Sequence, residues 1–265
     1  MKIQCFAIAL AASCGLAAQA QAQPSAEELA KKTQNPVSDL ISLPFQDNIN
    51  FGFGPDDEIL NVLNVQPVWP VALSERWNLI TRTILPIVSQ PGILPGDGRT
   101  WGLGDTLFTA FLSPREPGKL VWGAGPALQI PTATDDRLGA DKWALGPSLV
   151  VLAMPGRWVI GSLFSNVWSF AGSGDSDVNL FTWQYFLNYN LPGGWYLSSA
   201  PIVTANWEAQ SGDKWTVPFG GGVGKIFRVG GQSMNAQILA FYNVVKPDLG
   251  PDWTLRVQLQ LLFPK

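Results

Sequence analysis

Hydrophobic and polar residues alternate with a period of two along most of the chain after residue 43. The clearest case is the C-terminal segment, where Trp253, Leu255, Val257, Leu259, Leu261 and Phe263 alternate with Thr254, Arg256, Gln258, Gln260 and Leu262. This alternation predicts a β-strand with one apolar face. The same template predicts twelve strands, over residues 44–54, 59–73, 76–90, 101–113, 119–131, 142–154, 156–170, 178–191, 194–207, 214–229, 232–246 and 252–263.

The connections between these segments alternate between short turns and mostly longer loops. Short links such as Pro155–Gly156 and Gly230–Gly231 alternate with loops such as 91–100 and 132–141, where most of the acidic residues lie. An even number of strands with short turns at one rim and longer polar loops at the other is typical of an outer-membrane β-barrel. The sequence therefore predicts an antiparallel transmembrane β-barrel with both chain ends on the periplasmic side.

Tryptophans fall near the ends of the predicted strands. They flank the short turns at Trp77, Trp158 and Trp195 and the long loops at Trp101, Trp143, Trp168, Trp207, Trp215 and Trp253. Indoles settle at the level of lipid headgroups, so we expect two aromatic girdles. A soluble β-sandwich with a tryptophan-rich core is the alternative. Seven prolines inside the predicted strands must occupy bulges, strand ends or kinks, because proline cannot donate a ladder hydrogen bond.

Composition and charge remove several classes of function. The chain has no histidine, and its two cysteines, Cys5 and Cys14, lie in an apolar leader. These absences exclude His/Cys metal sites, Ser-His-Asp and Cys-His nucleophiles, and disulfides in the exported chain. No cofactor is predicted. The net charge of −3 does not indicate the basic surface that a nucleic-acid-binding protein needs.

The N-terminal region divides into two predicted parts. Residues 1–22 read as a cleaved signal peptide with Lys2, an apolar stretch and an Ala-Gln-Ala cleavage site, which implies export to the outer membrane. Residues 23–43 form a helical segment that starts with a Ser25/Glu28 capping box, and residues 44–265 form the barrel. The helical segment either stays in the periplasm or plugs the lumen. The plug is favoured by glycines at 123, 125, 220, 222 and 224, which permit close backbone approach, although these glycines could also merely let the sheet coil.

Five segments carry a resemblance to a known family. They are 29–53 (LAKKTQNPVSDLISLPFQDNINFGF), 77–91 (WNLITRTILPIVSQP), 128–136 (LQIPTATDD), 166–171 (NVWSFA) and 206–219 (NWEAQSGDKWTVPF). The chain resembles the bacterial outer-membrane family labelled "putative MetA-pathway of phenol degradation". The resemblance implies a transporter-like barrel associated with aromatic compounds. Barrels of this kind usually end on an aromatic residue that the barrel-assembly machinery reads, whereas Pro264 and Lys265 follow Phe263 here.

The leading functional hypothesis is a narrow passive channel for small solutes, aromatic ones among them. Twelve strands lie between barrels filled by side chains and barrels with a wide aqueous channel. The residues expected to line the pore are Asn61, Gln184, Asn188, Asn206, Asn235, Gln237, Arg256, Gln258 and Gln260. Arg256 is expected to favour an anionic group such as an aromatic carboxylate. The expected partners are outer-membrane lipid, lipopolysaccharide and the solute.

Three alternatives stay open. In the first, the polar groups hydrogen-bond one another and the N-terminal helix, which gives a closed structural barrel. In the second, the barrel is an enzyme that uses carboxylates such as Asp135 with Asp136 or Asp56 with Asp57. In the third, the acidic loops bind divalent cations that bridge to lipopolysaccharide.

Overall fold

The chain folds into a closed antiparallel β-barrel of twelve wall strands with one short helix, as the sequence predicts. The structure is a computed structural model that describes residues 25–94 and 96–264. Its elements are α1 (Ala26–Thr33), β1 (Ile41–Phe53), β2 (Glu58–Val65), β3 (Val68–Ala72), β4 (Trp77–Gln90), β5 (Thr100–Leu103), β6 (Thr106–Pro114), β7 (Leu120–Ile130), β8 (Lys142–Ala153), β9 (Trp158–Gly172), β10 (Asn179–Asn190), the 3-10 turn η1 (Pro192–Gly194), β11 (Trp195–Ser199), β12 (Ile202–Asn206), β13 (Trp215–Val229), β14 (Gln232–Val245) and β15 (Trp253–Phe263). The predicted signal peptide lies outside the described residues.

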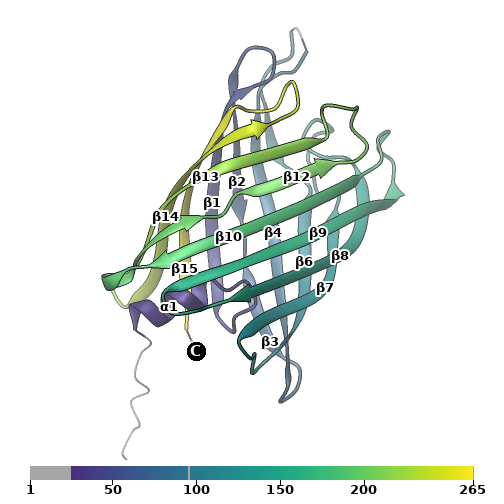
Figure 1. Cartoon of the computed structure of the whole chain (residues 1–265). Coiled ribbons are helices and arrows are strands. Elements are labelled where there is room, and N and C mark those ends of the chain that lie inside the picture. The colour runs from purple at the N-terminus through teal and green to yellow at the C-terminus, as the bar shows by residue number, and fades with distance from the viewer. Residues whose placement is uncertain (1–24, 95, 265) are drawn as a thin grey trace, which may run out of the picture.

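Neighbouring strands along the chain pair with each other, and the first and last wall strands close the barrel. β1 pairs with β15 from Ile41 opposite Phe263 to Phe51 opposite Trp253. Each predicted strand is present. Three of the twelve are each divided into two shorter strands, namely β2 and β3, β5 and β6, and β11 and β12. Figure 1 shows the strands tilted around a cylinder, with α1 at the end where the C-terminus lies.

Several strand prolines coincide with interruptions of the wall. Pro67 falls between β2 and β3, Pro201 falls between β11 and β12, and the register of β13 against β14 shifts at Pro218. Pro126 and Pro147 face each other across β7 and β8, and the β8–β9 ladder has no paired residues between Leu145 and Ser148. The expectation of bulges and strand ends is thus correct for Pro67, Pro201 and Pro218.

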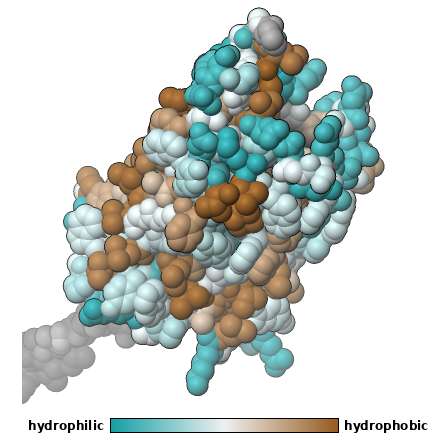
Figure 2. Space-filling view, turned by 45° about the horizontal axis from the view of Figure 1, so that its top comes forward, coloured by the Kyte–Doolittle hydropathy of each residue, from teal (hydrophilic) through white to brown (hydrophobic). Residues whose placement is uncertain are grey.

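The outer face of the wall is apolar. Exposed side chains include Phe45, Leu149, Ile160, Leu197, Ile238, Val257 and Leu259, and the girdle tryptophans other than Trp77 are exposed at strand ends. Figure 2 shows apolar and weakly polar residues over the wall, while strongly hydrophilic residues gather toward the ends. They are densest at the end that carries the longer loops, which we call the loop end. Such a surface is stable in contact with lipid.

The interior has two unlike halves. Toward β4 and β6–β10 it is filled by a buried apolar cluster of Ile80, Phe111, Val121, Val150, Leu152, Val159, Leu163 and Phe186, which also receives Val37 from the N-terminal segment. Toward β1 and β11–β15 the inward residues are mostly amides, hydroxyls and Arg256. One half is a packed apolar core, and the three hollows described below are lined mainly by the other half.

The N-terminal segment lies against the inside of the barrel at the end where the C-terminus lies. The Ser25 side chain accepts a hydrogen bond from the backbone N–H of Glu28, and the Glu28 side chain accepts one from the backbone N–H of Ser25. This is the predicted capping box. Leu29 and Ala30 on α1 are 1% and 0% exposed and form a buried cluster with Leu40, Ile226 and Leu262. Helices of this length are marginal alone, so this apolar contact holds α1 in place. None of the helices in the described ranges is long and apolar enough to cross a bilayer.

Candidate functional site

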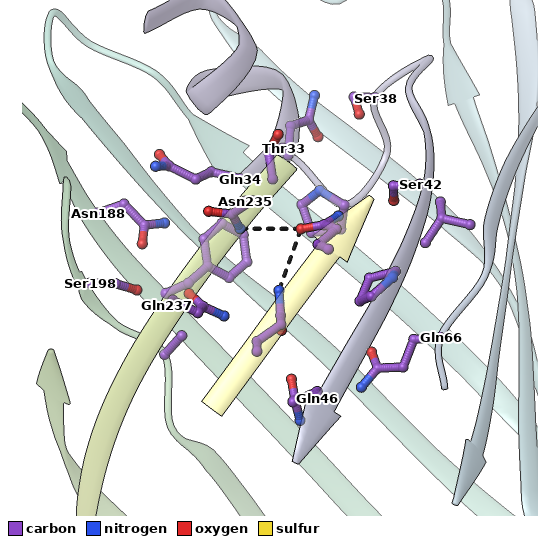
Figure 3. A pocket seen from close by; sticks show the side chains of 18 of the residues that line it. Thr33, Gln34, Ser38, Ser42, Gln46, Gln66, Asn188, Ser198, Asn235 and Gln237 are labelled. Atoms are coloured by element: carbon purple, nitrogen blue, oxygen red, sulfur yellow. Dashed lines mark hydrogen bonds between the residues drawn. The ribbon is translucent and has the colours of Figure 1, made fainter. Parts of the chain in front are cut away.

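A cavity of about 170 Å³ lies between the N-terminal segment and the polar half of the wall. Residues from the segment that follows α1 form one side of it, and β1, β10, β11, β14 and β15 form most of the rest. Seven of the nine residues predicted to line a pore meet here: Gln184, Asn188, Asn235, Gln237, Arg256, Gln258 and Gln260. Figure 3 shows Asn188, Ser198, Asn235 and Gln237 on one side and Ser42, Gln46 and Gln66 on the other, with Thr33, Gln34 and Ser38 among the N-terminal residues.

The other two predicted residues lie elsewhere. Asn206 lines a separate hollow of about 360 Å³ near the loop end, together with Thr204 and Thr216. Asn61 is opposite Ile49 in the register, and its Nδ2 donates to Oδ1 of Asp47 at 2.8 Å. Asn64, three residues on, faces inward instead. The prediction that Asn61 faces the lumen is wrong, because an odd spacing along a strand places two residues on opposite faces.

Hydrogen bonds fix part of the polar wall. Oη of Tyr196 donates to Oδ1 of Asn235 at 2.7 Å, and Nδ2 of Asn235 donates to Oε1 of Gln260 at 3.2 Å (Figure 3). Gln258 donates to the same oxygen at 3.4 Å. By contrast, Gln184 and Asn188 form no side-chain hydrogen bond with other described residues, so their amides are open to whatever occupies the cavity.

Gly224 makes room for the tyrosine of this network. A Cβ added to Gly224 would lie 2.1 Å from Cζ of Tyr196, whose side chain is held by its bonds to Asn235 and Gln237. The other glycines that suggested a plug differ from one another. Gly123 does face the N-terminal segment, with Cγ1 of Val37 at 2.9 Å from its added Cβ, whereas the added Cβ atoms of Gly125, Gly220 and Gly222 would meet strand carbonyls. Only Gly123 therefore fits the expected close approach of a plug.

We expect Gly224→Ala to destabilise the folded barrel by roughly 1–3 kcal/mol, since the new methyl group must displace a packed ring. Gly118→Ala is the matched control, because nothing lies within 4 Å of its added Cβ. Urea unfolding in detergent micelles, followed by tryptophan fluorescence, measures both. Equal midpoints for the two variants would contradict the role assigned to Gly224.

Two arginines line the same cavity, and the sequence singled out only one of them. Arg256 is 6% exposed; its Nε donates to Oδ1 of Asn48 and its Nη1 to the carbonyl of Ala200, both at 2.9 Å. Its guanidinium also lies 4.9 Å from the ring centre of Phe241. Arg82 on β4 donates from Nη2 to Oε1 of Gln66 at 2.6 Å. Among the described residues neither arginine forms an ion pair, and no acid lines this cavity.

Three hollows follow one another along the polar half of the interior. The main cavity shares Gln46 and Arg256 with a second hollow of about 290 Å³, which Asn48, Asn64 and Thr254 also line. The second hollow shares Thr204 and Thr216 with the loop-end hollow that Asn206 lines. The shared residues outline a polar path from the loop end past Arg256 to the N-terminal segment.

The N-terminal segment lies against that path at the end of the barrel where the C-terminus lies. Gln34 and Asn190 exchange two amide hydrogen bonds, of 3.0 and 3.1 Å, between the end of α1 and β10. Asn190 is 4% exposed, and Val37 inserts into the apolar cluster a few residues further on. This end of the lumen is therefore held by both polar and apolar contacts.

The acidic loops contain no cluster suited to a metal in the part of the chain that the structure describes. Asp135 instead binds its neighbour Arg137, whose Nε and Nη2 donate to the carboxylate at 3.0 and 3.1 Å. These hydrogen bonds hold the pKa of Asp135 below its usual value. Asp57 lies in a turn with φ of 53°. Of the four carboxylates considered for catalysis, Asp56, Asp57 and Asp136 are thus exposed in turns, and Asp135 is half-buried in a bend.

Solved structures include similar barrels. The COG4313 outer membrane channel from Pseudomonas putida F1 has a TM-score of 0.65 and 21% identity, over 86% of this chain and 97% of the channel. Outer membrane phospholipase A from Escherichia coli has a TM-score of 0.42 and 12% identity, over 86% of this chain and 97% of the enzyme. The first likeness shows a shared fold, and a twelve-stranded barrel fits the outer membrane. No curated protein sequence matches.

A family model provides the remaining comparison. It matches residues 59–195, just over half of the chain, from β2 to the start of β11. The match includes the strands that carry Arg82, Gln184 and Asn188. The chain belongs to the family described as "Putative MetA-pathway of phenol degradation".

Proposed function

We propose that this protein is a narrow passive channel through which small solutes, aromatic ones among them, cross the outer membrane. The observation that carries the proposal is the polar path of three hollows through one half of the lumen. The name of the similar Pseudomonas putida protein, an outer membrane channel, and the phenol-degradation label of the family support it.

The residues along the path suit a solute that keeps its hydrogen bonds while it moves. Gln184 and Asn188 offer free amides, and Asn235, Gln258 and Gln260 form a fixed ladder of donors and acceptors beside them. Such groups can replace the hydration of a passing molecule one bond at a time. The packed apolar half of the barrel leaves little width, so the pore is narrow.

The N-terminal segment acts in this proposal as a plug at the periplasmic exit. Its docking on the wall through Leu29, Ala30 and Val37 and its paired amides at Gln34 and Asn190 support that role. We further propose that residues 1–22 direct export and are cleaved, and that the barrel-assembly machinery inserts the chain among lipids and lipopolysaccharide.

Uptake by a deletion strain tests the proposal. We expect the strain to take up or grow more slowly on low concentrations of some members of a panel of aromatic and aliphatic carbon sources. The gene supplied in trans should restore the rate. Equal uptake with and without the gene over the whole panel would remove the transport role.

A further inference from the structure

We propose that Arg82 and Arg256 form a binding site in the lumen for a small carboxylate that carries an apolar ring. The inference rests on the proposed function and names the solute class that the channel selects. It starts from an imbalance of charge, because both guanidinium groups line the main cavity and no carboxylate lines it among the described residues.

Buried cations without carboxylate partners need another source of negative charge. Arg256 is 6% exposed, and of its five N–H donors two are taken by protein groups, Oδ1 of Asn48 and the carbonyl of Ala200. Arg82 gives one hydrogen bond, to Gln66. Neither arginine forms other hydrogen bonds within the described residues, so the remaining donors are available to a ligand. A carboxylate matches the planar fork of a guanidinium.

The rest of the cavity fits a ring rather than a bare ion. Phe186, Val68, Leu40 and Pro36 line it together with the two arginines. Its volume of about 170 Å³ is close to the roughly 150 Å³ of a protein cavity that accepts benzene. The cavity therefore offers cationic and apolar surfaces together, at a size suited to one aromatic ring with a carboxylate.

The position of the site explains how it would act on transport. The main cavity is the last of the three hollows before the N-terminal segment, and Arg256 lies where it meets the second hollow. An anion that enters from the loop end reaches Arg256 first and Arg82 within the same cavity. The pair would thus concentrate carboxylates at the exit and disfavour amines of the same size.

Calorimetric titration of benzoate into the folded protein in detergent micelles tests the site without requiring transport. We expect saturable binding by the unaltered chain, and binding at least about tenfold weaker in Arg82→Gln and in Arg256→Gln. Lys119→Gln with Lys225→Gln is the matched control, since both lysines lie outside the cavity lining, and it should bind as the unaltered chain does. Empty micelles correct for partition of benzoate into detergent.

The unaltered protein alone provides a second test, which does not depend on how the variants fold. Benzylamine and benzyl alcohol should bind much more weakly than benzoate, because only benzoate brings the missing negative charge. Absence of saturable benzoate binding, equal binding of all three ligands, or full affinity in both folded arginine variants would overturn the proposal. A barrel that binds benzoate but passes no solute would keep the site and refute the channel instead.

Discussion

Leu29→Asp should raise the single-channel conductance in planar bilayers several-fold above that of the unaltered chain. Leu29 is 1% exposed between α1 and the wall, and a carboxylate there would have no cation among its cluster neighbours, which are all apolar. An unpaired buried charge is costly, so α1 should detach from the barrel wall. The path that ends at the N-terminal segment would then open to the periplasmic side.

Two further variants serve as controls for this experiment. Ala26→Asp adds the same charge to an exposed position in the first turn of α1, where a carboxylate is compatible with the helix dipole, and it should conduct like the unaltered chain. Deletion of residues 25–40 should conduct at least as well as Leu29→Asp. Unchanged conductance in both Leu29→Asp and the deletion would show that this segment does not close the pore.

Ile238→Arg should destabilise the barrel folded in lipid vesicles, lowering its free energy of unfolding by about 2–4 kcal/mol. Ile238 lies near the middle of β14, is 54% exposed on the outer face, and pairs with Val257 and Val223 on its two neighbours. An arginine at that depth meets hydrocarbon rather than water. Unfolding in urea, with the barrel refolded in vesicles, measures the change.

Gln258→Arg is the matched control for the outer-face substitution. Gln258 is opposite Gln237 on the adjacent rung of the same strand pair and faces the main cavity. The added charge there stays in contact with the lumen, so the cost should be well below that of Ile238→Arg. A larger loss for Gln258→Arg than for Ile238→Arg would mean that the inner and outer faces are assigned the wrong way round.

The strand pattern could be predicted because the alternation of residues follows directly from the geometry of a strand at a lipid boundary. β15 shows this most clearly, with apolar residues at each outward position and Arg256, Gln258 and Gln260 inward. The walls, the turns and the polar lining from β10, β14 and β15 were therefore within reach of sequence analysis. The orientation of Asn61 could not be predicted in this way, because β2 carries asparagines on both faces. Only the register of β2 with β1 decides which asparagine points inward.

The division of the lumen depends on tertiary contacts that alternation does not report. β8 is apolar on both faces, with Val150 and Leu152 inward and Leu145 and Leu149 outward, so its sequence does not reveal whether the inner face meets water. Arg82 was missed for a related reason: it stands in a strand whose other residues are largely apolar. Its importance follows from the shared cavity with Arg256, which only the closed barrel creates.

Liposome swelling with the full-length protein tests most directly whether the polar half of this barrel is a pore. Vesicles that contain the protein should swell in isotonic solutions of the smallest uncharged solutes, and the rate should fall steeply with solute size. Leu29→Asp should swell faster than the unaltered chain with each permeant solute. Swelling no faster than in empty vesicles, for the unaltered chain and for Leu29→Asp alike, would contradict the account and identify a closed barrel.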